Sequence, residues 1–242
     1  MKKKMYVLGV AALVAALLAM SGVAQSAMWV GAELGGNFAS GSANTNLFGI
    51  DISADLGFKP SVIGGAIIGY DFVNSGFGAY AWPDWMKYFS FATDITYNRL
   101  QLNSLDNISV GPLNFNDSVT VKLDGYCVAW TFLFMAHYGF LPDSEVPGGR
   151  INPYIGVGPA ILWSGFENPV GNGRADAMNV ALVVEPGIRW MAFKNVSIDT
   201  AMRYRYAVPS YDIGNIIPEV GNFNLSPTLH QFAFLVRANY HF

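Results

Sequence analysis

Charged side chains are scarce in this sequence, and cysteine is almost absent. Only 13% of the 242 residues are charged, whereas 52% are hydrophobic and 14% are aromatic; an average soluble chain has about 25% charged residues. Cys127 is the single cysteine, so no internal disulfide can form and this thiol is most simply a small buried side chain. Histidines and cysteines do not cluster, and no acidic loop has calcium spacing. We therefore expect neither a metal nor a cofactor.

Long apolar runs are also missing after the first 20 residues. Lys2, Lys3 and Lys4 precede an apolar stretch that ends at Met20, and small residues follow it. The stretch is shorter than the roughly 18–20 residues of a membrane-spanning helix, which disfavours an uncleaved anchor. This pattern predicts a signal peptide at 1–24, with cleavage possible up to 27. The remaining chain, 25–242, is then one domain.

Basic residues are too few for binding to nucleic acid. Removing the three leader lysines from 14 basic residues leaves 11 against 17 acidic residues, a net charge of −6. No basic cluster interrupts this acidic balance. Nucleic acid is excluded as a partner.

Alternation of apolar and polar residues dominates the rest of the chain and predicts β-strands. Stretches rich in Gly, Asn, Ser and Pro separate the strands, and every second connection is long. The long connections are 39–61, 103–118, 166–176 and 209–227. The eight predicted strands are 28–38, 62–73, 87–102, 119–140, 150–165, 177–192, 195–208 and 228–242.

This arrangement is typical of an all-β, antiparallel, up-and-down transmembrane barrel with short periplasmic turns and longer extracellular loops. An even number of strands places both termini on the periplasmic side. Residues 48–58 also alternate, and we interpret them as a β-arm in the first external loop. Ten strands remain possible if a further strand lies within 103–118.

The volume of the two strand faces decides which one points outward. In the last strand Phe232 and Phe234 lie on one face, whereas Arg237 and Asn239 lie on the other. About twenty aromatic rings gather on the first kind of face, and an eight-stranded barrel has no interior room for them. The apolar face therefore points to lipid, with Tyr and Trp near the strand ends.

The same alternation places nine charged residues in the lumen, where unpaired charge is costly. Two interpretations remain: an ion-pair plug, favoured by the narrow interior, or a charged and partly wet conduit. The predicted lumen charges are Glu33, Asp71, Asp94, Glu185, Arg189, Asp199, Arg203, Arg205 and Arg237.

Four segments resemble the small OmpA/OmpX-like outer-membrane barrel proteins: 29–35, 65–72, 153–159 and 239–242. The resemblance covers the mature chain and implies an outer-membrane location, lipid and lipopolysaccharide neighbours, and a monomer. It also implies that the β-barrel assembly machinery reads Phe242 as an assembly signal. The chain departs from the pattern at 74–86, which is long for a periplasmic turn.

No catalytic set is evident, so we expect no enzyme activity. The leading hypothesis is a non-enzymatic barrel with a role in envelope structure or in passage of small solutes. An alternative is an adhesin that binds surface ligands through 39–61 and 209–227. A lipid A-modifying enzyme would need His230, which lies at the predicted external rim, but Ser226 does not form a recognisable pair with it.

Overall fold

Eight wall strands close into one antiparallel barrel. The computed structural model describes residues 28–47, 50–72, 82–115, 118–167, 174–214 and 223–242, so the predicted signal peptide lies outside the described residues. The wall strands are β1 (Met28–Leu47), β3 (Ser61–Asp71), β4 (Phe89–Val110), β6 (Val119–His137), β7 (Ile151–Glu167), β8 (Arg174–Phe193), β9 (Val196–Ala207) and β12 (Thr228–His241).

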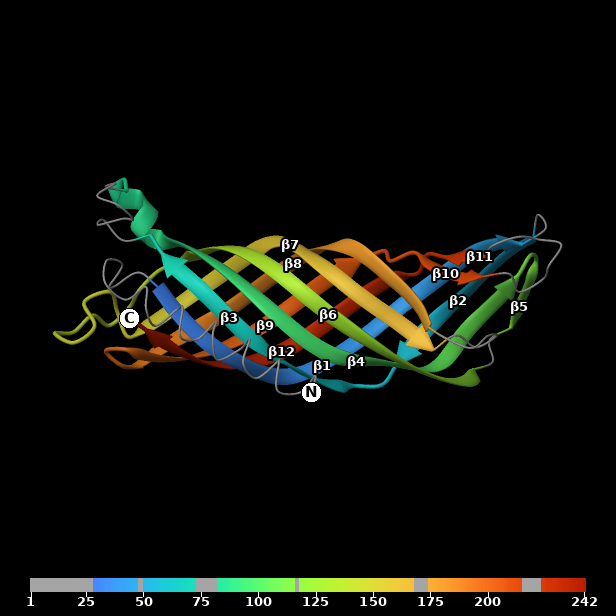
Figure 1. Cartoon of the computed structure of the whole chain (residues 1–242), viewed down its shortest axis with the longest axis horizontal. Coiled ribbons are helices and arrows are strands. Elements are labelled where there is room, and N and C mark those ends of the chain that lie inside the picture. The colour runs from blue at the N-terminus through green and yellow to red at the C-terminus, as the bar shows by residue number, and fades with distance from the viewer. Residues whose placement is uncertain (1–27, 48–49, 73–81, 116–117, 168–173, 215–222) are drawn as a thin grey trace, which may run out of the picture.

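Pairing of the first and last strands closes the ring. Their register runs from Trp29 opposite His241 to Ser42 opposite Thr228. Around the ring the order is β1, β3, β4, β6, β7, β8, β9 and β12, so β4 and β9 stand opposite one another. The C-terminus and the 3₁₀ helix η2 (Asp84–Tyr88) lie at one end, which we name the terminal end (Figure 1). The other we name the loop end.

The first external loop was predicted wrongly. Residues 50–58 form β2 (Ile50–Phe58), which is neither a separate arm nor a ninth spanning strand. β2 pairs with the outer part of β1 on one side and of β4 on the other, so it continues the wall position of β3. Lys59 and Pro60 alone separate β2 from β3. The strand is interrupted there because proline lacks the N–H that a ladder requires. The predicted loop 39–61 is therefore mostly barrel wall.

Two further short strand sets extend the loop end (Figure 1). β4 runs to Val110 and turns back into β5 (Leu113–Phe115), and among the described residues β5 pairs only with β4. β10 (Tyr211–Gly214) and β11 (Phe223–Leu225) form a hairpin within the predicted loop 209–227. The ring thus has eight positions, and the described residues do not form the ten-stranded alternative.

The outer surface around the middle of the barrel is apolar, as the alternation predicted. Val180, Val62 and Leu34 are 69%, 68% and 63% exposed. Among the described residues, no helix is long and apolar enough to cross a membrane. Such an apolar belt on the outside of closed strands suits a surface that faces lipid.

The polarity of the two strand faces reverses toward the loop end. Along β4 the outward residues change from Ile95 to the exposed Arg99, while the inward residues change from Asp94 to Leu100. Beyond the lipid belt, water surrounds the barrel, so charged side chains favour the outside and apolar ones the inside. The lumen within the belt therefore holds the buried charges beside apolar residues such as Ile67 and Leu133, and toward the loop end it becomes apolar.

Candidate functional site: a charged lumen below an apolar chamber

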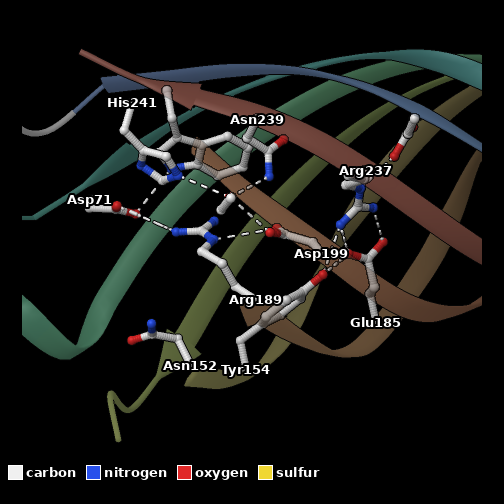
Figure 2. Close-up of polar contacts among 12 residues, drawn as sticks. Asp71, Asn152, Tyr154, Glu185, Arg189, Asp199, Arg237, Asn239 and His241 are labelled. Atoms are coloured by element: carbon white, nitrogen blue, oxygen red, sulfur yellow. Dashed lines mark hydrogen bonds and ion pairs between the residues drawn. The ribbon is translucent and has the colours of Figure 1, made fainter. Parts of the chain in front are cut away.

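Glu185 is the centre of a buried ion-pair network in the lumen. Its carboxylate accepts hydrogen bonds from Arg203 Nε at 2.6 Å and from Arg237 Nη1 at 2.6 Å. Arg237 also donates through Nε to Glu33 at 2.6 Å and through Nη1 to the Tyr154 hydroxyl at 2.9 Å. Figure 2 shows Arg237 facing both Glu185 and Tyr154. Short charge-assisted bonds of this kind compensate the cost of burying each charge.

Arg203 carries the network across the full width of the barrel. It projects from β9, and its Nη1 donates to Asp94 Oδ1 on the opposite strand β4 at 3.1 Å. Arg203 and Asp94 are 2% and 1% exposed. Because Arg203 and Asp94 project from opposite strands and meet, their ion pair bridges the lumen at this level.

A second group of charges lies nearer the terminal end. Arg189 pairs with Asp199 at 3.3 Å and with Asp71 at 3.4 Å. Its guanidinium lies over the Trp29 ring, 4.5 Å from the centroid, and the Trp29 indole donates to Asp71 Oδ1 at 3.1 Å. Figure 2 shows Arg189 between Asp71 and Asp199. Eight of the nine predicted lumen residues are buried, and Asp71 is half-buried.

Arg205 differs from the other lumen arginines. It is 2% exposed, yet no carboxylate of the described residues forms an ion pair with it. Its Nη1 donates to Gln231 Oε1 at 3.0 Å, and its Nη2 donates to Thr96 Oγ1 at 3.4 Å. Its Nε has no partner in the described chain.

An apolar chamber of about 320 Å³ occupies the lumen above Arg205, toward the loop end. The Tyr211 hydroxyl, 2.7 Å from Ser164 Oγ, supplies a satisfied polar pair beside it. Glu167 is the one charged residue of the chamber wall among the described residues, and it is exposed. The wall consists of Ala43, Ile52, Ala54, Leu56, Phe58, Leu102, Leu105, Val121, Leu123, Phe166, Glu167, Ala175, Pro209, Tyr211, Pro227 and Leu229.

A polar vestibule of about 760 Å³ opens at the terminal end. The turn between β6 and β7 reaches into its wall with Val146, which is 7% exposed. Asp143 shapes this turn: it accepts the backbone N–H groups of Glu145 and Val146 and pairs with Arg150. The Val146 N–H and then the Arg150 side chain lower the pKa of Asp143.

His230 lies outside the lumen. Its Nδ1 is 2.7 Å from the Tyr204 hydroxyl, and its ring packs near Tyr206. Ser226 donates to Ser210 at 3.1 Å. In the part of the chain that the structure describes, no three His, Cys, Asp or Glu side chains are grouped as metal ligands.

Comparison with solved structures shows which fold this is. The crystal structure of the outer membrane protein OprG from Pseudomonas aeruginosa superposes with a TM-score of 0.56 and 12% identity, covering 92% of this chain and 98% of that one. This chain has the fold of a small outer-membrane β-barrel. No protein-family model matches the sequence, and a search of curated proteins gave no match.

Two other outer-membrane barrels resemble this chain more loosely. Neisserial surface protein A matches with 15% identity and a TM-score of 0.40, covering 89% of this chain and 97% of its own. Ail of Yersinia pestis, in complex with the heparin analogue sucrose octasulfate, matches with 12% identity and a TM-score of 0.41. That match covers 89% of this chain and 99% of Ail.

The sequence prediction did not identify Trp29 and Tyr154 as inward residues of this outer-membrane barrel. Trp29 has the same parity as Glu33 in β1, so parity alone could have placed it. Tyr154 lies on the inner face of β7 and is 6% exposed. Gln231 has the same parity as Arg237 in β12, but the predicted lumen set contained charged residues only.

Proposed function

We propose that this outer-membrane barrel is not an enzyme and that it takes up small apolar molecules in the loop-end chamber, above a lumen closed by ion pairs. The observation that carries the proposal is the apolar chamber itself. Its volume of about 320 Å³ lies in the range of ligand pockets, about 300–1,000 Å³. The chamber favours apolar solutes as ligands, because polar solutes would lose hydration there without gaining partners.

The cross-lumen pairs support a closed barrel rather than a conduit. Arg203 reaches the opposite wall, and Arg237 binds acids from two other strands. We propose that the terminal end faces the periplasm, because the start of β1 and the end of β12 lie there together with the two-residue turn between β8 and β9. Lipopolysaccharide contact, a monomeric state and assembly by way of Phe242 stay predictions.

The chamber can be tested by NMR of leucine methyl groups in the barrel, reconstituted in lipid nanodiscs and titrated with naphthalene. Leu56 and Leu123 line the chamber, whereas Leu34 is 63% exposed on the apolar outer belt. We expect saturable shifts at the first two and only partition-like shifts at Leu34. Shifts at Leu34 alone would contradict the proposal.

A matched pair of variants checks that the shifts come from the chamber. Leu102→Trp fills the chamber, and Gln101→Trp adds the same ring on the neighbouring residue of the other face. Binding should weaken by roughly tenfold or more in the first, because a bulky side chain excludes the ligand. It should stay unchanged in the second.

The closed lumen is tested by planar-bilayer conductance. Wild-type protein should show no stepwise conductance, whereas Arg237→Ala removes the side chain that joins Glu33 to Glu185 and should open steps. Arg237→Met, which keeps most of the volume without the charge, separates loss of volume from loss of pairing. Wild-type steps of full size would refute the closed lumen.

A further inference from the structure

The unpaired Arg205 below the chamber is the feature that calls for an explanation. Each of the other lumen arginines contacts at least two carboxylates: Arg189, Arg203 and Arg237. Arg205, equally buried, has only the neutral oxygens of Gln231 and Thr96. A buried cation without an anion lowers the stability of the fold. Its presence therefore implies a benefit that offsets this cost.

The lack of an anion does not follow from a general shortage of acids. The predicted lumen set holds five acids for four arginines, and the acids all lie on the terminal side of Arg205 or at the level of Arg203. Directly across the barrel from Arg205, strand β4 offers Thr96 instead of an acid. Arg205 is therefore a buried cation at the upper edge of the network, with an unused N–H at Nε.

Its position relates it to the chamber. Arg205 stands opposite Gln231 in the β9–β12 ladder, and the next inward pair toward the loop end is Ala207 opposite Leu229. Leu229 belongs to the chamber wall. Two residues of a strand span roughly 7 Å, so on the β9–β12 side Leu229 and the small Ala207 are the first inward residues beyond Arg205. On the β4 side the buried Asn98 and Leu100 lie between Thr96 and the chamber residue Leu102. The long arginine side chain can cover such a distance by a change of rotamer.

We propose that the chamber binds single-chain amphiphiles with a carboxylate head, the acyl chain lying in the chamber and the carboxylate pairing with Arg205. This inference rests on the proposed function, since it assigns the ligand class of the same chamber. The apolar wall would hold the chain, and the carboxylate would replace Thr96 and Gln231 as the partner of the guanidinium. Glu167 does not oppose this, because it is exposed and its partner in the β7–β8 register is Arg174.

The test compares ligands that share one chain and differ in the head. Laurate, dodecanol and dodecyltrimethylammonium are titrated into the protein in nanodiscs, and the Leu229 methyl shifts give an apparent affinity for each. Charge-assisted hydrogen bonding at a buried site should favour laurate over dodecanol by roughly tenfold or more. The ammonium compound should bind more weakly than either, because it would face a cation.

Variants then assign the preference to one side chain. Arg205→Gln should weaken laurate binding by about tenfold and leave dodecanol binding unchanged, whereas Arg205→Lys should keep part of the preference. The matched control is Arg99→Gln, the same exchange at an exposed arginine of the outer surface. Lipid partitioning of each ligand cancels in the ratio between protein variants. Heat-dependent gel mobility checks that each variant is folded.

The outcomes separate the two proposals. If dodecanol and naphthalene bind but laurate shows no preference, or if Arg205→Gln keeps the full preference, the carboxylate inference is wrong and the chamber remains. If none of the ligands shifts the chamber methyls, the proposed function is itself overturned. If Arg205→Gln does not fold, the wild-type order of laurate, dodecanol and ammonium compound still decides the inference.

Discussion

The exchange Arg203→Gln is expected to destabilise the barrel far more than the exchange Arg205→Gln. The two arginines lie two residues apart on the inner face of β9, and each is 2% exposed. They differ in their partners: Arg203 contacts Glu185 and both oxygens of Asp94, whereas Arg205 has only neutral ones. The comparison therefore isolates the effect of a buried carboxylate partner.

The magnitudes follow from what each exchange leaves behind. Without Arg203, Asp94 loses both hydrogen bonds from that guanidinium and becomes a buried anion, which costs about 3–5 kcal/mol. Without Arg205, the hydrogen bonds from its guanidinium to two neutral oxygens are lost, each with a net value of about 1.5 kcal/mol, but the cost of an uncompensated buried cation also disappears. We expect the free energy of unfolding of Arg205→Gln to stay within about 1 kcal/mol of wild type.

The assay is urea-dependent folding into lipid vesicles, followed by tryptophan fluorescence and by gel mobility. Adding Asp94→Asn to Arg203→Gln removes both charges of the pair, so it should recover a large part of the loss. Equal losses for the two single exchanges would refute the assignment of Arg205 as the unpaired arginine. So would a larger loss at Arg205.

Two further predictions concern the terminal end. The pKa of Asp143 is lowered in the folded state, so this carboxylate contributes stability above its unfolded pKa of about 4. That stability is lost as the pH falls through the lower folded pKa. A pH series of urea titrations should therefore show that the difference in stability between wild type and Asp143→Asn vanishes in acid. Gly69→Val should destabilise the barrel by about 2 kcal/mol or more, since a Cβ at Gly69 would overlap the Trp29 ring that covers Arg189; an unchanged unfolding midpoint would contradict this packing.

The barrel could be predicted from the sequence because one rule applies along each strand in the lipid belt. Lipid requires an apolar outside and a closed ladder, so alternation both marks the strands and orients them. Phe234 and Arg237, three positions apart in β12, fall on opposite faces as the rule demands. The same rule predicts charged residues on the inner face, and eight of the nine predicted residues are buried.

The rule fails where the lipid belt ends. Above it the outside medium is water, so apolar residues such as Leu56 and Leu102 turn inward while Asp55 and Arg99 face outward. The alternation at 48–58 was evident, but the prediction placed this segment in the loop 39–61 as a β-arm, because a ninth spanning strand would put the C-terminus outside the cell. A change of polarity within one strand, as from Asp94 to Leu100, was the signal that could have revealed the chamber.

The partners within the lumen could not be predicted from the strands. Whether an arginine meets an acid depends on which residue of the opposite wall lies at the same height, and strand register around the ring sets this. Arg203 and Arg205 are equivalent by local pattern, yet only one faces Asp94. The residue opposite each arginine, Asp94 or Thr96, lies on another strand, more than 100 residues away in the sequence.

That difference can be removed with one substitution. Thr96 faces Arg205 across the lumen as Asp94 faces Arg203, one strand repeat further along the same two strands. Thr96→Asp would therefore give Arg205 a carboxylate of its own, and we expect the barrel to gain about 1 kcal/mol of stability after the desolvation cost of the new acid. The same substitution should abolish the preference for laurate over dodecanol, because the guanidinium is already paired. If stability rises while the preference remains, Arg205 is only a strained structural residue and the carboxylate binds elsewhere. If the preference disappears as stability rises, the unpaired arginine serves ligand binding rather than the fold.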